Sequence, residues 1–319
     1  MKKLIIPLLL LAFSCENVEV EKSASKLDPS LLMSLASKNA DGARKTVTSS
    51  GDILADINAA LASRGMQIQV SMMEYYGADE TGNTVFFNNR GNKQLSADFV
   101  PADPRRGGDA DIKYLIDDTE SSTSSGLTGA QTNSAITSSM NTWNNISCSS
   151  GLAINTFGPL PIDFGIVQFI FGLGGNGGLF TDVMHAGFLP APLFDAIAPN
   201  GSSFILGVTF TFNWVDGDGN PTDIDNNGKT DVALREIYYN DTFGWNIGST
   251  YDVETVSLHE AGHALSQGHF GKAFRSGGNN KLHFSPRAVM NAAYSGVQRE
   301  IAETDNAGHC SNWASWPNN

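Results

Sequence analysis

The chain has 319 residues, a formal net charge of −13 at pH 7 and three cysteines. The acidic balance argues against nucleic acid as a partner, because a phosphate backbone attracts basic protein surfaces. The same balance suits an exported protein and leaves many carboxylates available to bind cations. About 300 residues follow the N-terminal segment described next, which is enough for one large domain or for a domain and a smaller unit.

Residues 1–15 have the pattern of a signal peptide. Two lysines precede Leu4–Phe13, an apolar run that is too short to span a bilayer as a helix. The residues before Cys15 resemble a bacterial lipoprotein cleavage site, with the small residue Ser14 directly before the cysteine. Lipid on Cys15 would anchor the protein to a bacterial membrane; the alternative is an ordinary secretory signal and a secreted protein. Both interpretations predict export.

Residues 16–50 are polar and are expected to form a tether. The apolar side chains of Gly51–Arg64 recur at helical spacing. Met66–Tyr76 alternates like a strand, and Thr84–Asn88 is expected to be its partner. Residues 51–108 are therefore predicted to be a small α+β region. Its role is open between a pro-segment, an adhesion module and an extension of the main domain.

The segment from residue 109 to the C-terminus contains the remaining expected elements. They are a strand at Ile112–Ile116, a long helix at Leu127–Ile146 capped by Thr128, a strand at Leu152–Phe157, a buried strand or ordered loop at Ile162–Gly178, strands at Phe204–Trp214 and Val232–Asn240, a helix that follows the N-cap Asp252, and a C-terminal helix from Asp305 to Trp313. The apolar face of the long helix is expected to contain Ala130, Ala135, Met140 and Trp143.

Cys148 and Cys310 are the two cysteines within this segment. An exported compartment permits a disulfide between them, which would join the two ends of the main domain. Two buried free thiols are the alternative.

An acidic loop follows the strand at Phe204–Trp214. Asp223, Asp225 and Asn227 occupy alternate positions and are followed by a glycine, as in the first half of an EF-hand calcium loop. The glutamate expected at loop position twelve is missing, and Asp231 is the candidate substitute. The loop therefore predicts a Ca²⁺ site, with an exposed acidic turn as the alternative.

Metal chemistry is indicated most strongly at residues 259–269. His259, Glu260 and His263 form an HExxH motif, and His269 follows six residues after His263. Two histidines four apart lie on one face of a helix and can bind one metal ion. A turn after the helix would bring His269 to the same ion and leave a fourth position open, as a catalytic zinc site requires. Glu260 is then placed to act as general base on a metal-bound water.

The motif and the residues after it resemble the metzincin clan of zinc endopeptidases, and most closely its matrixin branch. Ser285–Tyr294 looks like the Met turn of the clan, with Met290 as its methionine. The spacing of Met290 and Tyr294 is similar to that of matrixins, so Tyr294 is not expected to be a ligand. The family has glycine where this chain has Ser266. Either serine adopts the left-handed conformation, at about 1 kcal/mol or more of strain, or Gly268 makes the turn.

The resemblance implies an α+β fold with a twisted mixed sheet, a long first helix, a zinc-binding active-site helix, a Met turn and a C-terminal helix. A small N-terminal α+β extension would precede residues 109–319, the zinc metalloprotease domain. The resemblance also implies that substrate binds in extended form along an edge strand, Val232–Asn240. Matrixins are often held latent by a propeptide cysteine, and no cysteine lies between Glu16 and Ser147, so that mechanism is absent here.

His185 lies in Thr181–Pro190, which resembles the matrixin segment with a structural-zinc histidine. A closed structural site takes four protein ligands, and no other histidine lies between His185 and His259. A second zinc is therefore not expected, and a hydrogen-bonded histidine near a strand end is the preferred interpretation.

The sequence as a whole predicts an exported zinc-dependent endopeptidase in which Glu260 is the general base. The alternative is a non-catalytic or calcium-dependent surface-binding lipoprotein on a metalloprotease fold. The intact set of three histidines and a glutamate favours the enzyme.

Overall fold

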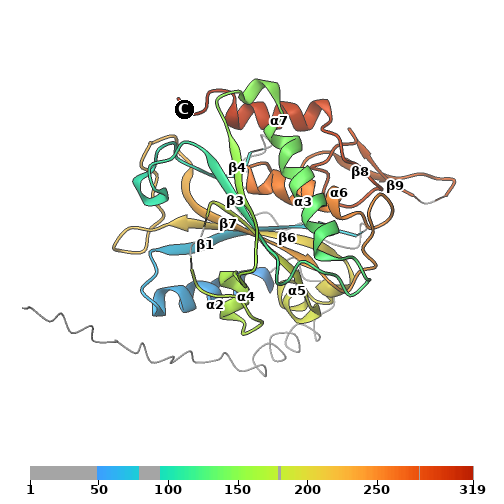
Figure 1. Ribbon diagram of the computed structural model, residues 1–319. Coiled ribbons are helices and arrows are strands. Elements are labelled where there is room, and N and C mark those ends of the chain that lie inside the picture. Colours follow the sequence, from blue (N-terminus) through green and yellow to red (C-terminus); the bar gives the residue numbers. More distant parts are fainter. Residues whose placement is uncertain (1–48, 79–93, 179–180, 280, 319) are drawn as a thin grey trace, which may run out of the picture.

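The computed structural model describes residues 49–78, 94–178, 181–279 and 281–318. Within them the chain has an α+β fold, as expected, with a seven-stranded mixed sheet, a two-stranded sheet and six α-helices (Figure 1). None of the described helices combines the length and the apolar character needed to cross a membrane. The predicted signal peptide, nearly all of the tether and the expected strand at 84–88 lie outside the described residues.

The elements have the following bounds. The helices are α2 (Ser49–Ser63), α3 (Gly129–Asn144), α4 (Ile166–Ile170), α5 (Ala191–Ile197), α6 (Val253–Ala264) and α7 (Glu303–Trp313), with 3-10 turns at Pro104–Arg106, Ser147–Ser149 and Gly201–Ser203. The strands are β1 (Ile68–Gly77), β2 (Ala97–Asp98), β3 (Ile112–Asp117), β4 (Ile154–Leu160), β5 (Val183–Leu189), β6 (Ile205–Trp214), β7 (Thr230–Asn240), β8 (Lys272–Arg275) and β9 (Leu282–Ser285).

The strands of the large sheet are ordered β1-β6-β7-β5-β3-β4, and the short β2 pairs with the start of β7. β3, β4, β5 and β7 run parallel, whereas β6 runs antiparallel between β7 and β1. The expectation that Val232–Asn240 is an edge strand is wrong, because β7 has β6 on one side and β5 on the other. β1, from the N-terminal region, occupies the edge next to β6 instead.

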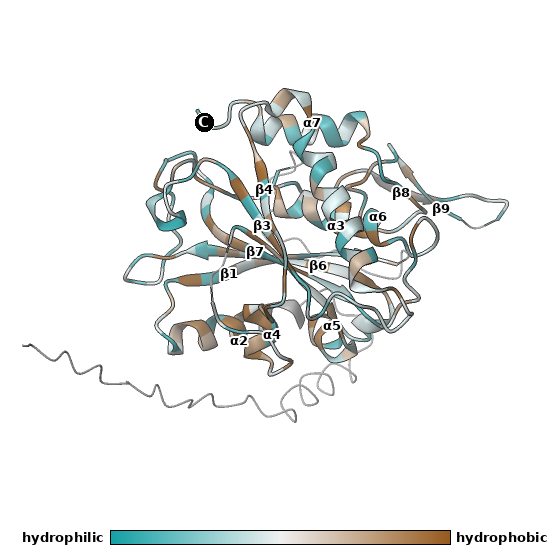
Figure 2. Cartoon of the chain, viewed as in Figure 1, coloured by the Kyte–Doolittle hydropathy of each residue, from teal (hydrophilic) through white to brown (hydrophobic). Residues whose placement is uncertain are grey.

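Helices cover both faces of this sheet. Figure 1 shows α3, α6 and α7 on one face and α2, α4 and α5 on the other. Each face has its own core of buried apolar side chains. Figure 2 shows hydrophobic residues in the strands and on α2, α4 and α5. Burial of apolar surface on both faces is the main stabilising contribution to such a layered fold.

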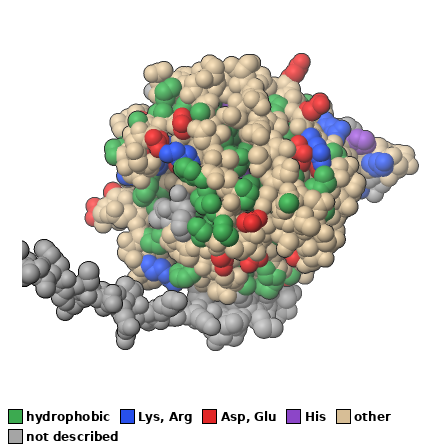
Figure 3. All heavy atoms as spheres, in the orientation of Figure 1, with side chains coloured by type: hydrophobic (Ala, Val, Ile, Leu, Met, Phe, Trp, Pro, Cys, Tyr) green, Lys and Arg blue, Asp and Glu red, His purple; other side chains and the backbone are tan. Residues whose placement is uncertain are grey.

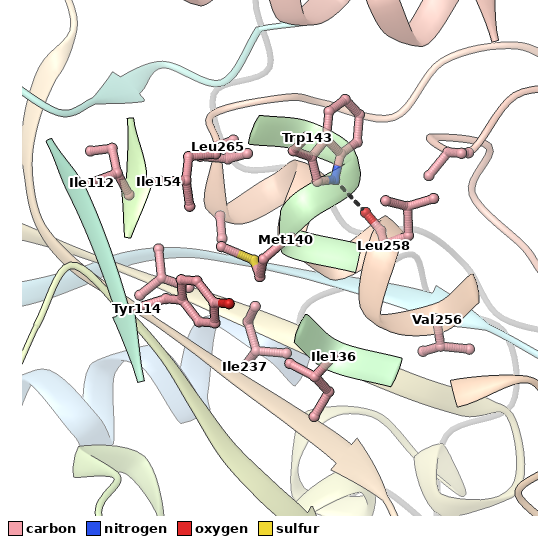
Figure 4. Packing of buried hydrophobic residues seen from close by; sticks show 14 of the residues in the cluster. Ile112, Tyr114, Ile136, Met140, Trp143, Ile154, Ile237, Val256, Leu258 and Leu265 are labelled. Atoms are coloured by element: carbon pink, nitrogen blue, oxygen red, sulfur yellow. Dashed lines mark hydrogen bonds between the residues drawn. The ribbon is translucent and has the colours of Figure 1, made fainter. Parts of the chain in front are cut away.

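The long helix α3 packs against α6 through the side chains that its pattern predicted. Ala135, Met140 and Trp143 are buried, whereas Ala130 is exposed, so that residue was assigned wrongly to the apolar face. The Trp143 indole N–H donates to the Leu258 carbonyl oxygen at 2.8 Å (Figure 4). This bond fixes α3 against α6, the helix that contains the HExxH motif.

The N-terminal region belongs to the main sheet. A register shift between Val70 and Met72 changes which residues of β1 face each side of the sheet. Ile68, Val70 and Tyr75 pack with α2, whereas Met72 joins the core on the face of α6. The simple alternation expected for this strand is therefore interrupted by the bulge.

Two other segments differ from expectation. Ile162–Gly178, expected to be a buried strand or an ordered loop, contains the short helix α4. Residues 271–282 contribute to the β8–β9 hairpin. Figure 3 shows basic side chains and a histidine on the part of the surface that projects at the right of the view. Arg275, Lys281 and His283 of this hairpin are exposed. The C-terminal helix starts earlier than predicted, with Ala302 as N-cap.

A disulfide joins Cys148 and Cys310 across a separation of 162 residues. Of the two alternatives, a disulfide and two free thiols, the structure therefore contains the disulfide. Cys148 lies in the 3-10 turn after α3, and Cys310 lies on α7. The bond fastens the C-terminal helix to the layer formed by α3 and α6.

We expect the double substitution Cys148→Ala and Cys310→Ala to lower the free energy of unfolding by about 2–4 kcal/mol, because the long loop between them is no longer closed in the unfolded chain. Urea unfolding would measure this. Wild-type protein kept in dithiothreitol is the control and should resemble the variant. A variant as stable as oxidised wild type would contradict the expectation.

Candidate metal centre

Helix α6 is capped at both ends by side chains. Asp252, the predicted N-cap, accepts a hydrogen bond from the Thr255 amide at 3.0 Å. At the other end the buried Arg235 guanidinium donates to the Ala264 carbonyl oxygen at 2.8 Å and to the Ser266 hydroxyl at 2.9 Å. The last carbonyls of a helix lack partners within it, and Arg235 supplies one at the point where α6 ends.

Ser266 makes the turn that follows α6. Its φ of 66° is in the left-handed region, whereas Gly268 is not among the described residues with positive φ. Of the two alternatives for this turn, it is therefore Ser266, and not Gly268, that adopts the left-handed conformation. Its hydroxyl bond to Arg235 and the Leu95 amide, which donates to its carbonyl oxygen at 2.9 Å, help to hold this strained conformation.

The turn brings three histidines together. The Nε2 atoms of His259 and His269 are 2.8 Å apart, and the Nε2 atom of His263 lies 3.0 Å from each. All three side chains are buried, with His269 the most exposed at 7 %. The group could hold a metal ion.

In two of these rings the second nitrogen, Nδ1, lies within hydrogen-bond distance of a backbone carbonyl oxygen. Nδ1 of His259 lies 2.7 Å from the Val289 oxygen, and Nδ1 of His263 lies 2.8 Å from the Gln267 oxygen. A carbonyl only accepts, so each Nδ1 donates, and the lone pair of each neutral ring lies on Nε2. Lone pairs pointing at a common centre repel one another unless a cation or a proton lies between them. The donor set therefore fits a metal ion.

The electrostatics of the pocket favour a neutral ring at two of the three histidines. Burial lowers the pKa of His259 and of His269 well below the usual range, with a further contribution from His263. At His263, burial also acts to lower the pKa, but the nearby Glu74 carboxylate outweighs it and the pKa is raised.

Glu74 is a site residue that the sequence analysis missed. It lies on β1, is 2 % exposed, and its carboxylate contacts His263 at Nδ1. Among the described residues neither of its oxygens has another hydrogen-bond partner. The only signal in the sequence is one acidic residue within the apolar run of β1, and strand periodicity does not reveal which helix it faces.

Glu260 is completely buried beside β6. The Thr209 hydroxyl donates to one carboxylate oxygen at 2.6 Å, and burial raises the pKa of Glu260 to about 8. Gly207 provides the space, since a Cβ there would lie 2.9 Å from the other carboxylate oxygen. The structure thus places a carboxyl group that can hold a proton near neutral pH one residue from the first histidine.

Tyr76 is the second site residue that the sequence analysis missed. Its ring stacks on His259, with centroids 3.9 Å apart and planes at 13°. The rings of Tyr76 and Tyr294 meet edge to face, with their centroids 6.1 Å apart.

The predicted Met turn lies against α6. Met290 is buried, and a Cβ at Gly262 would overlap its sulfur atom. Helix α6 and the Met290 side chain therefore approach as closely as a glycine allows. The Asp305 carboxylate of α7 accepts hydrogen bonds from the Val289 and Met290 amides at 2.8 and 3.0 Å. The turn therefore holds the Val289 carbonyl that orients His259.

The acidic loop brings carboxylates of Asp223, Asp225 and Asp231 within 4.8 Å of one another. Asp231 also forms an ion pair with Arg105 at 2.8 Å, which offsets part of the negative charge. The Asn227 side-chain amide donates to Asp98 and to Asp225 rather than presenting its oxygen to the group. Calcium binding at this loop stays a prediction.

His185 lies apart from the metal centre. Its Nδ1 is 2.8 Å from the Tyr239 hydroxyl, and burial lowers its pKa to about 3. It belongs to neither of the two groups of described residues that could hold a metal ion. The bond to Tyr239 is the hydrogen bond that was expected for this histidine.

No protein-family model matches this chain, and neither does any curated protein. The resemblance to metzincins therefore rests on the residues of the motifs alone and stays a prediction.

We expect His269→Ala to weaken zinc binding by about 100-fold or more, since even residues that only orient ligands cost 10–100-fold. Competition with a zinc-binding dye would measure the affinity. His185→Ala is the matched control, because it also removes a buried histidine but should leave zinc affinity unchanged. Equal affinities of the two variants would place the third ligand elsewhere.

We also expect Gly262→Ala to lower the free energy of unfolding by about 1–3 kcal/mol, the usual cost of overpacking a core, because the new methyl group displaces the Met290 side chain. Urea unfolding would measure this. Combining it with Met290→Ala should cost less than the sum of the two single changes. Strict additivity would mean that the two residues do not press on each other.

Proposed function

We propose that this protein is a zinc-dependent endopeptidase that resembles the matrixin branch of the metzincins. The observation that supports this most directly is the convergence of three Nε2 atoms within 3.0 Å, beside the buried carboxyl group of Glu260. Three imidazoles without thiolate suit Zn²⁺ and leave a coordination position for water or substrate. His259, His263 and His269 would hold the ion.

The residues of the chain then have separate roles. Bound zinc would supply Lewis-acid activation of a water molecule and of the scissile carbonyl. Glu260 takes the proton of the attacking water and delivers it to the leaving nitrogen. Its pKa, raised to about 8 by burial, favours a carboxyl group that releases and accepts protons near neutral pH. The Val289 and Gln267 carbonyls fix the ring orientation of two ligands.

The proposal includes export. The N-terminal residues favour a protein anchored to a bacterial membrane through lipid on Cys15, or secreted if a general signal peptidase acts instead. A protein or peptide in extended conformation would be the substrate.

A calcium-dependent surface-binding protein is the second candidate. The grouping of three carboxylates at Asp223, Asp225 and Asp231 favours it. Such a protein would bind its partner without cleaving it, and would release that partner on removal of calcium alone. Zinc-dependent cleavage would exclude it as the main function.

We expect Glu260→Gln to retain zinc and to lose about 10²–10⁴-fold in kcat, the usual contribution of a general base. Cleavage of a broad peptide library followed by mass spectrometry would measure turnover, and atomic emission would measure bound zinc. Glu254→Gln, a change of the same kind on the first turn of α6, is the control and should keep full activity. Wild-type turnover in zinc-loaded Glu260→Gln would remove Glu260 from the mechanism.

A further inference from the structure

The metal centre is closed in this structure. His259, His263 and Glu260 are 0 % exposed, and His269 is 7 % exposed. A peptidase must admit several residues of an extended chain to its metal. Strand β1 covers the centre from one side, since Tyr76 and Glu74 both contact histidines of the group.

The end of β1 lies between two other backbone segments. On one edge it pairs antiparallel with β6, and the Ala78 amide donates to the Phe204 carbonyl oxygen at 2.6 Å. On the other edge the Tyr294 amide donates to the Gly77 carbonyl oxygen at 2.7 Å. The Gly77 amide donates to the Ala292 carbonyl oxygen at 3.4 Å. Backbone bonding of this kind is how proteins bind an extended peptide without regard to its sequence.

The side chain of Tyr76 fills an aromatic slot beside the metal centre. His259 lies on its face at 3.9 Å, and Tyr294 lies at 6.1 Å with its plane turned by 62°. Tyr76 is only 4 % exposed. Its backbone amide lies close to the Glu260 carboxylate and acts to lower the pKa of that group. The peptide unit between Tyr75 and Tyr76 therefore lies beside the proposed general base.

We propose that β1 occupies the groove in which substrate binds, so that the chain blocks its own active site. The groove is formed by the edge of β6 and residues 292–294, and its slot beside His259 takes an aromatic side chain. The substrates are accordingly extended peptides with Phe or Tyr next to the bond that is cleaved. This inference rests on the proposed peptidase function, and it requires β1 to be displaced before substrate enters.

Two variants of the full-length chain test the proposal. Tyr76→Ala empties the slot, and Gly77→Pro removes the amide that bonds to Ala292 while leaving the tyrosine in place. Tyr75→Ala is the matched control, because Tyr75 is equally buried but packs in the core on the other face of the sheet. Circular dichroism verifies that each variant is folded.

Two readouts are compared with wild type. The first is the rate at which EDTA removes zinc, which reports access to the centre independently of catalysis. The second is cleavage of the peptide library, repeated with Glu260→Gln added to each variant. We expect Tyr76→Ala and Gly77→Pro to raise both rates about tenfold or more, the effect of losing one aromatic or hydrogen-bonded contact. Tyr75→Ala should change neither.

The outcomes separate this inference from the proposed function. Faster zinc removal without cleavage by any variant supports the closure by β1 and contradicts the peptidase. Cleavage by wild type that falls in Tyr76→Ala and Gly77→Pro supports the peptidase and overturns the closure, since β1 would then be a fixed part of the active site. Unchanged zinc removal in both variants also overturns it.

Discussion

Three imidazole nitrogens that meet within 3.0 Å are the constraint on which the rest of this structure depends. Two of them come from one face of α6 and need only a regular helix. The third requires α6 to end at Ala264 and the chain to reverse within a few residues. That reversal uses a left-handed serine, whose strain is tolerated because Arg235 binds both the end of the helix and the Ser266 hydroxyl.

A chain of contacts continues this constraint into the C-terminal part of the protein. His259 is oriented by the Val289 carbonyl, and the amides of that turn are bound by Asp305 on α7. The disulfide fastens α7 to the turn after α3, and Trp143 of α3 is bonded to α6. The orientation of His259 is thus supported by elements that are distant in sequence, as a preorganised metal site would require.

Local features of the sequence predicted much of this arrangement. The i, i+4 histidines, the cap at Asp252 and the buried residues of α3 other than Ala130 each depend on residues within one helix. The pairing of β1 with β6 could not be predicted in this way, because it joins residues about 140 apart and strand periodicity does not identify a partner. Because strand periodicity does not identify pairing partners, β7 was expected at an edge of the sheet. For the same reason Glu74 and Tyr76 on β1 were not recognised as site residues.

The charge balance of the site explains why the missed strand matters. Glu74 and Glu260 are two buried carboxyl groups, and buried charge is costly unless it is compensated. His263, whose pKa is raised by Glu74, can compensate one of these carboxylates, and a divalent cation held by the three histidines would compensate both. Without β1 the centre would lose Glu74, and β6 would become an open sheet edge, which is a site where extended peptides add by backbone pairing. The strand that adds Glu74 to the candidate metal centre is therefore also the strand that lies where the proposed substrate would bind.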